Sequence, residues 1–333
     1  MIFLSSVGFL FKERKCMDYE ERKEIVKIAI YYYYKDMTQE QIANKLSVSR
    51  SVISRNLQKA KDLGIVNFYI KDESFPIINM QSELEEKFHI NKVIVAPSYN
   101  LSEAEVDNIV VKHAIHYLKE EFKTVNKVGI SWGRSLSLLA REFPYEIHKD
   151  LTLVPLIGGM SNLDIEKHSN QICYDLMKKL QCQCNYLYAP ALAENDIIRK
   201  EFYESPYISN ALVAGRNVDM AILGIADPFA KNNLMRKIGY ITNQDLKELE
   251  ELEVVGDINS RFFNKDGEEV DCRINNQVIG ISLEEIKNIP NTVVIASGSE
   301  KKRAVLSAVK AGYVNTLIID DRIAEYLLQN DVM

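Results

Sequence analysis

A series of short apolar runs, separated by longer segments with helical patterns, most constrains the fold. The runs are rich in Val, Ile and Leu and occupy residues 91–96, 127–131, 151–157, 184–188, 219–225, 292–296 and 316–320. Such alternation is typical of βαβ units, which build a parallel sheet with helices on both faces. We therefore predict an α/β domain over residues 91–333, with a doubly wound, mainly parallel sheet. A linker helix is expected over residues 75–90.

Residues 17–74 have a different pattern, which predicts a winged helix-turn-helix domain. Apolar residues at helical spacing indicate a first helix over residues 20–35. Thr38 and Gln41 have the spacing of a capping box for a second helix. Residues 47–49 then form a turn, and Ser49 is expected to cap a third helix that starts at Arg50. Residues 65–70 fit the strand of a wing.

The third helix is predicted to bind DNA, because the second helix of such a motif reads the major groove. Residues 41–61 carry five cations and no acid, on a chain whose net charge is −6. Arg50 and Arg55 are long enough for bidentate contact with guanine. The candidate DNA-binding residues are Thr38, Gln39, Ser49, Arg50, Ser51, Ser54, Arg55, Gln58 and Lys59. The alternative is a three-helix packing element with a solvated basic face and no role in DNA binding.

Composition argues against several other classes of protein. The five cysteines, at positions 16, 173, 182, 184 and 272, contain no C-x-x-C pair, which favours reduced thiols over disulfides. We find no metal-ligand spacing and no cofactor fingerprint, so neither a metal nor a cofactor is expected. The apolar stretch within residues 1–16 is too short to span a bilayer. It is interpreted as an extension or a start-site artefact, with Met17 as the initiator, in a cytoplasmic protein without a membrane partner.

The clearest candidate ligand site lies after the run at residues 127–131. Ligands of parallel sheets usually bind beyond the C-terminal ends of the strands. Here Gly133 allows a close turn and a helix follows, whose free N–H groups and dipole attract anions. Arg134 and Ser135 add side-chain donors. This is a candidate phosphate cradle, although it lacks the GK[ST] of a P-loop. An ordinary tight turn between strand and helix is the alternative.

Three further predicted strand ends carry glycines or charged residues that could also contact a ligand. Gly158 and Gly159 close one run, Asp257 follows Gly256, and Lys301 follows a glycine after the run at residues 292–296. Taken alone, Asp257 can be a turn carboxylate and Lys301 a solvated helix residue. Several polar groups at successive strand ends nevertheless favour one shared pocket, with Gly133, Arg134, Ser135, Gly158, Gly159, Asp257 and Lys301 as its candidate effector-binding residues.

From Met17 onward the chain resembles the SorC family of bacterial sugar-operon regulators. The likeness rests in part on the predicted DNA-reading segment at residues 38–55, which we call the reader. It also rests on GISWGRS at 129–135, PLIGG at 155–159, YAP at 188–190, GDI at 256–258, RFFNKDG at 261–267, GSEK at 298–301 and VNTLIIDD at 314–321. The resemblance implies an effector domain similar to the ribose-phosphate isomerase and CoA-transferase fold, a phosphorylated sugar effector and a homo-oligomer, typically a tetramer.

The resemblance also implies roles for single residues. Gly133, Arg134 and Ser135 would hold phosphate, and Asp257 and Lys301 would face the polyol part. Ser297 departs from the family, because many members have a second glycine there. Some members hold an effector aldehyde through a lysine Schiff base, but no lysine here can be matched to that position.

Two functions remain to be separated. The favoured one is a transcriptional regulator that binds operator double-stranded DNA, responds to an effector and has no catalytic residues. The competing one is a sugar-phosphate-processing enzyme with an N-terminal assembly domain, in which Asp257 and Lys301 perform acid-base or amine chemistry. The basic face of the third helix favours the regulator, because an enzyme of this kind has no use for it.

Overall fold

The computed structural model describes residues 19–68, 71–159 and 163–330 of the chain. The chain divides into two compact units, Met1–Asp72 and Glu73–Met333, close to the predicted boundary between residues 74 and 75. The expectations for residues 1–16 and Met17 lie outside the described residues. Among the described residues, no helix is long and apolar enough to cross a membrane.

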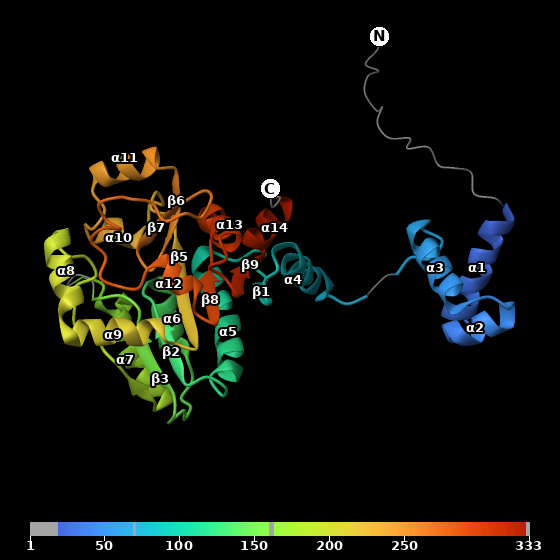
Figure 1. Cartoon of the computed structure of the whole chain (residues 1–333), viewed down its shortest axis with the longest axis horizontal. Coiled ribbons are helices and arrows are strands. Elements are labelled where there is room, and N and C mark those ends of the chain that lie inside the picture. The colour runs from blue at the N-terminus through green and yellow to red at the C-terminus, as the bar shows by residue number, and fades with distance from the viewer. Residues whose placement is uncertain (1–18, 69–70, 160–162, 331–333) are drawn as a thin grey trace, which may run out of the picture. The chain divides into compact units, whose positions relative to one another are not determined.

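Within its described residues, the first unit contains three helices, α1 (Tyr19–Tyr33), α2 (Gln39–Leu46) and α3 (Arg50–Asp62) (Figure 1). The predicted capping box is present at the start of α2. The hydroxyl of Thr38 accepts from the Gln41 N–H at 3.2 Å, and the Gln41 side chain accepts from the Thr38 N–H at 2.9 Å. The three helices pack around Ile28, Ile42 and Ile53, all fully buried, as their helical spacing predicts.

The predicted wing strand is absent from residues 65–68, and residues 69 and 70 lie outside the described part of the chain. The cause is local. The N–H groups of Ile65 and Val66 both donate back to the Ala60 carbonyl, at 2.9 and 3.1 Å, and so close the end of α3. Both side chains then pack against α1 and α3 beside Ala60.

The second unit is built on the predicted parallel sheet, with the strand order β1-β9-β8-β5-β2-β3-β4. Every neighbouring pair along this path is parallel. Its strands are β1 (Lys92–Ala96), β2 (Lys127–Ile130), β3 (Thr152–Pro155), β4 (Gln183–Cys184), β5 (Met220–Ala226), β8 (Asn291–Ala296) and β9 (Thr316–Asp320). The run predicted at residues 184–188 forms only the two-residue edge strand β4.

Helices cover both faces of this sheet, which confirms the doubly wound α/β prediction (Figure 1). One face packs on α13 (Lys302–Lys310) and α14 (Asp321–Gln329), and the other on α5 (Glu103–Glu121), α6 (Arg134–Glu142) and α7 (Ser169–Leu180). The remaining helices are η1 (Ile165–Lys167), α8 (Asp196–Glu204), α9 (Pro206–Arg216), α10 (Leu234–Lys237), α11 (Asn243–Glu251), α12 (Leu283–Lys287) and η2 (Ser299–Lys301). The cysteines within the described residues are free thiols.

The helix predicted as a linker, α4 (Phe75–Phe88), packs within the second unit. Its Leu84 is fully buried in the same core as Val93 of β1 and Leu327 of α14. The side chains of Gln81 and Glu85 accept hydrogen bonds from the N–H groups of Val95 and Val93, at 2.9 and 2.8 Å. The helix thereby covers the free edge of β1, which would otherwise expose unpaired backbone groups.

An antiparallel hairpin extends the end of β5. It consists of β6 (Val254–Ile258) and β7 (Arg261–Asn264), and β6 pairs with β5 through Ile225↔Ile258 and Ala226↔Asp257. The turn between the two strands is made by Asn259 and Ser260, both with a left-handed backbone at φ 55° and 61°. This register brings Asp257 to the C-terminal end of β5, where ligands of parallel sheets bind.

Candidate functional site: an effector cavity and a nucleic-acid interface

A cavity of about 360 Å³ opens at the C-terminal ends of β2 and β5. Its wall includes the turn into α6, the end of β5, the segment around α10, the β6–β7 hairpin and η2. Five residues predicted as effector-binding line it together: Gly133, Arg134, Ser135, Asp257 and Lys301. Residues that are far apart in the sequence are therefore brought into one pocket, as the strand-end argument predicted.

The start of α6 forms one side of this cavity. Gly133 has φ 120°, a conformation that other residues rarely adopt, and nothing lies within 4 Å of where its Cβ would be. The glycine is therefore required by the backbone turn rather than by crowding. Its own N–H donates to the Lys167 carbonyl at 3.0 Å and is not free for a ligand. The next N–H groups, at the first turn of α6, have no partner within the helix and can bind an anion.

Arg134 is held at the cavity wall by an ion pair. Its Nε lies 3.4 Å from Asp107 Oδ2 on α5, and its side chain is 49% exposed. The Ser297 hydroxyl donates to the other oxygen of Asp107. Ser297, which departs from the family pattern, therefore helps to fix the carboxylate that orients Arg134.

Lys301 and Asp257 are the buried charged residues of the cavity wall, with 9% and 5% of their surfaces exposed. Burial lowers the pKa of Lys301, although the carboxylates of Asp107 and Glu300 oppose the shift. Burial raises the pKa of Asp257 to about 7, with a further contribution from Asp227. The Asp257 Oδ1 atom is buried and has no hydrogen-bond partner among the described residues.

The turn of the β6–β7 hairpin forms hydrogen bonds with the residues that precede α6. Asn259 Oδ1 accepts from the Ser131 hydroxyl at 2.9 Å, and the Ser260 hydroxyl accepts from the Trp132 indole N–H at 2.9 Å. Asn259 also lines the cavity. Since Ser131 and Trp132 directly precede Gly133, the hairpin turn positions the first turn of α6.

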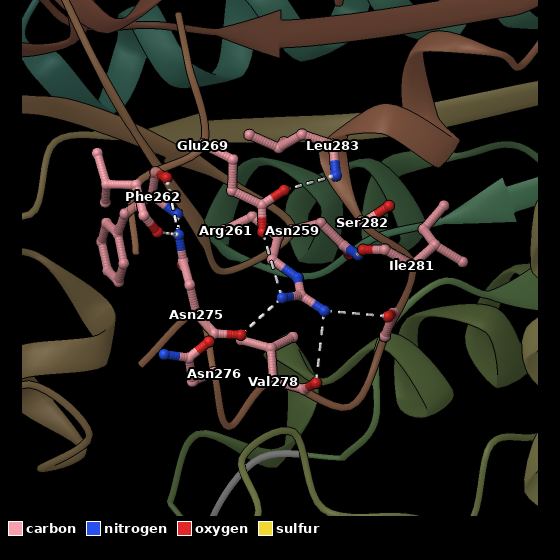
Figure 2. Close-up of polar contacts among 12 residues, drawn as sticks. Asn259, Arg261, Phe262, Glu269, Asn275, Asn276, Val278, Ile281, Ser282 and Leu283 are labelled. Carbon is pink, nitrogen blue, oxygen red and sulfur yellow. Dashed lines mark hydrogen bonds and ion pairs between the residues drawn. The ribbon is translucent and has the colours of Figure 1, made fainter. Parts of the chain in front are cut away.

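Arg261, next to this turn, fixes it to the loop that follows. Figure 2 shows its guanidinium between the Glu269 carboxylate and the backbone carbonyls of Asn275, Val278 and Gly280. The Asn275 side chain in turn bonds both backbone groups of Phe262. Arg261 is buried and does not line the cavity, so its role in the RFFNKDG motif is to hold the hairpin in place.

Two further cations line the cavity near α6. Lys167 lies on η1 and Lys237 on α10, and both contact Asp164, at 2.5 and 3.2 Å. Asp164 thereby joins two segments at the cavity through a shared carboxylate. Sequence analysis did not identify these lysines, because they lie in connecting segments rather than at strand ends.

Gly158 and Gly159, also predicted to bind effector, do not line this cavity, so the structure does not bring them together with the other five candidates. A Cβ at Gly158 would lie 2.3 Å from the Pro190 carbonyl oxygen, so this glycine is needed where two backbones approach closely. Gly159 donates to the Ala189 carbonyl at 2.7 Å. The two glycines therefore pair β3 with the segment of the YAP motif.

The candidate DNA-binding residues lie on α3 and at the start of α2. Arg50, Ser51, Ser54 and Arg55 are exposed, and neither arginine side chain forms an ion pair or hydrogen bond with another described residue. Thr38 caps α2 and Gln39 is half-buried beside it. Ser49 occupies the N-cap position of α3, but its hydroxyl contacts Ser51 instead of making the expected capping bond.

The last two candidates on α3 already have partners. Gln58 donates to Asp62 at 2.9 Å, and Lys59 pairs with Glu21 of α1 at 2.7 Å. The positive charge of α3 is thus partly neutralised by Glu21 of α1. The sequence of α3 alone does not reveal this contact.

Comparison with known proteins decides the family. The family described as "Putative sugar-binding domain" matches residues 73–329. The sorbitol operon regulator of Klebsiella pneumoniae is 30% identical over 307 residues, which span 92% of this chain and 97% of that protein. The chain belongs to the SorC family of sugar-operon transcriptional regulators.

Solved structures of SorC-family and related regulators agree with this assignment. The full-length sorbitol operon regulator of Klebsiella pneumoniae has a TM-score of 0.74 at 29% identity, covering 93% of this chain and 99% of that one. A DeoR family transcriptional regulator from Listeria monocytogenes has a TM-score of 0.71 at 45% identity, covering 76% and 99%. The chain is therefore a transcriptional regulator controlled by a sugar-type effector, and the alternative of a sugar-phosphate enzyme is set aside.

Proposed function

We propose that this SorC-family regulator binds a phosphorylated sugar or a related metabolite in the cavity at the end of β2 and β5, and that occupancy changes its operator affinity. One observation supports the proposal most strongly. A single cavity is lined by the first turn of α6 and by four cationic side chains, those of Arg134, Lys167, Lys237 and Lys301. A helix N-terminus beside cations is a strong site for a phosphate group.

The neutral part of the ligand would lie against the other polar residues of the wall. Asp257 and Asn259 are both buried there, and Asn259 is already fixed by hydrogen bonds to the carbonyls of Leu156 and Ile281. Hydroxyl groups can donate to carboxylates and accept from Lys301. The combination of an anion site with buried acceptors supports a phosphorylated polyol or sugar over an unphosphorylated one.

DNA binding in this proposal uses Arg50 and Arg55 for base contacts, with Ser51 and Ser54 beside them on the exposed face of α3. The exposure of these residues and the lack of competing partners for the two arginines support the assignment. Thr38 and Gln39 at the start of α2 and Lys59 further along α3 would contact phosphates, which position the reader without specifying sequence.

An effector can alter operator affinity only if it binds two global states unequally. We propose that the states differ in the placement of reader units within a homo-oligomer, expected to be a tetramer. Readers must match half-sites spaced by whole helical turns, so a small rotation lowers affinity. Light scattering coupled to size-exclusion chromatography tests this: a monomer at working concentrations contradicts it.

The effector class is tested by operator release. An operator is first selected from randomised duplex DNA with the full-length protein. Its affinity is then measured by fluorescence polarisation with matched pairs of phosphorylated and unphosphorylated sugars and polyols. We expect only phosphorylated members to change the affinity. Equal action of both members of every pair would contradict the proposed phosphate site.

A further inference from the structure

The cavity contains a second carboxylate that the strand-end analysis did not select. Asp227 directly follows β5, and it lines the same cavity as Asp257. Because Ala226 is the register partner of Asp257 in the β5–β6 pair, the two aspartates lie on adjacent positions of neighbouring strand ends. The charge of Asp227 contributes to the raised pKa of Asp257, and burial raises the pKa of Asp227.

Asp257 points to a missing ligand group. It is 5% exposed, and its Oδ1 is buried without a partner among the described residues. A buried acceptor without a donor destabilises the protein, so such atoms in native structures call for a physical explanation. A donor supplied by a ligand in the cavity would satisfy it.

Asp227 has one oxygen available for the same ligand. Its Oδ1 accepts from the Phe229 N–H at 2.8 Å, and its backbone carbonyl accepts from the Asn233 side chain at 3.0 Å. These bonds fix the side chain at the cavity wall. In the described part of the chain, nothing donates to its Oδ2.

We propose that Asp227 and Asp257 form a hydroxyl-reading pair, in which each carboxylate accepts a hydrogen bond from one of two neighbouring hydroxyl groups of the effector. This inference rests on the proposed function, because it assumes that the cavity is the effector site. It narrows the effector to a phosphorylated compound that carries a diol.

The surrounding charges favour neutral donors over a cation. The ammonium of Lys301 lies close enough to Asp257 to act on its ionisation, and Arg303 acts likewise on Asp227. A bound metal ion or amine would be repelled by both. A second phosphate beside the pair would be repelled by the two aspartates and by Glu300, which also lines the cavity. Hydroxyl groups avoid both penalties and donate well to carboxylates.

The decisive variant is Asp227→Asn in the full-length protein. Asparagine keeps an oxygen that can accept from the Phe229 N–H, so the turn is preserved, while the other oxygen becomes an NH₂ donor. Glu300→Gln is the matched control, because it removes a negative charge that also acts on Asp227 but leaves both carboxylates of the pair in place. Operator affinity and the midpoint of thermal unfolding establish that each variant is folded.

Binding is measured by calorimetry with two matched pairs of probes and with inorganic phosphate. Glycerol 3-phosphate carries a vicinal diol that propyl phosphate lacks, and the furanose ring of ribose 5-phosphate carries one that the furanose ring of 2-deoxyribose 5-phosphate lacks. We expect the wild type to prefer the diol in at least one pair by about tenfold. Asp227→Asn should abolish that preference and leave inorganic phosphate unchanged, whereas Glu300→Gln should retain the preference.

The outcomes separate the two proposals. If Asp227→Asn keeps the full preference while phosphate still binds, or if the wild type prefers the diol in neither pair, the hydroxyl-reading pair is overturned and the phosphate site stands. If neither phosphate nor any phosphorylated probe binds the wild type, the proposed function fails and the pair fails with it. Loss of the preference in both variants also overturns the pair, because the effect would then follow from charge alone.

Discussion

The proposed DNA-reading helix α3 and the proposed effector cavity both carry cations, but the two regions hold those cations differently. On α3, Arg50 and Arg55 are exposed and form no ion pair within the described residues. In the cavity, Arg134 is paired with Asp107, and Lys167 and Lys237 with Asp164. Under the proposed function, DNA would meet free charges on α3, whereas an effector phosphate would compete with the carboxylates of Asp107 and Asp164.

This difference separates affinity from selectivity. Free cations attract a dense polyanion over a long range, and the binding falls steeply with salt. Cations that already have partners gain less from any one anion, so binding depends on how well the ligand replaces the existing contacts. Under the proposed function, the cavity would therefore discriminate among small anions by how well each replaces these contacts.

The largest effect is expected on the reader. Changing Arg50 and Arg55 to alanine should each cost ~1–3 kcal/mol of operator affinity and relax specificity at one base pair. Lys27→Ala, on an exposed face of α1, is the control and should have little effect. Affinity is measured by fluorescence polarisation against single-base operator variants. Unchanged affinity in both arginine variants would show that α3 is not the reading helix.

In the cavity, Arg134→Ala and Lys301→Ala should leave operator binding intact and weaken the effector response. Loss of a charged hydrogen-bond donor costs roughly 1.5–3 kcal/mol of ligand affinity. Arg134 should lie at the lower limit, because its exposed side chain is already paired with Asp107 and so gains less from a bound phosphate. The concentration of phosphorylated effector that half-releases operator is the readout, with the exposed Lys112→Ala on α5 as control. Identical responses in Arg134→Ala and wild type would show that the start of α6 is only a structural turn and does not bind the effector phosphate.

The sequence predicted the reader in more detail than the cavity, for a physical reason. The reader is specified by local signals, such as the spacing of Thr38 and Gln41, which act within one turn of helix. The cavity is assembled from strand ends, so Asp257 and Lys301 could be proposed from position alone. Its ion pairs could not, because Asp107 and Asp164 meet their partners only after the chain has folded. The same holds for Glu21, which neutralises part of α3 from α1.

Asp257 provides a test through pH. Burial raises its pKa from the usual 3.8 to about 7, so folding favours its neutral form. Its contribution to stability is therefore greatest at low pH and is lost as the pH rises from about 4 through 7. Asp257→Asn should raise the unfolding midpoint at pH 8 by more than at pH 5, corresponding to on the order of 1–3 kcal/mol, the cost of a buried unpaired polar group.

Asp245 supplies the control for this experiment. Hydrogen bonds from Arg273 and Thr242 outweigh burial and lower its pKa to about 2, so it is ionised at both pH values. Asp245→Asn should therefore destabilise the protein equally at pH 5 and pH 8. If Asp257→Asn also shifts the midpoint equally at both pH values, Asp257 does not titrate in this range and its environment is more polar than its burial implies.

The smallest effect concerns an ion pair that α3, the proposed reading helix, forms with α1. Lys59 and Glu21 lie 2.7 Å apart with side chains 44% and 45% exposed, and such a pair contributes about 0–1 kcal/mol. If DNA draws Lys59 away from Glu21, Lys59→Ala should reduce the salt slope of binding by about one. Glu21→Gln should tighten binding slightly for all sequences. Glu20→Gln, which frees Lys23 on α1 instead, removes the same charge and should do less. Equal effects of the two glutamine variants would mean that only net charge matters, and that Lys59 belongs with the paired cations of the cavity rather than with Arg50 and Arg55.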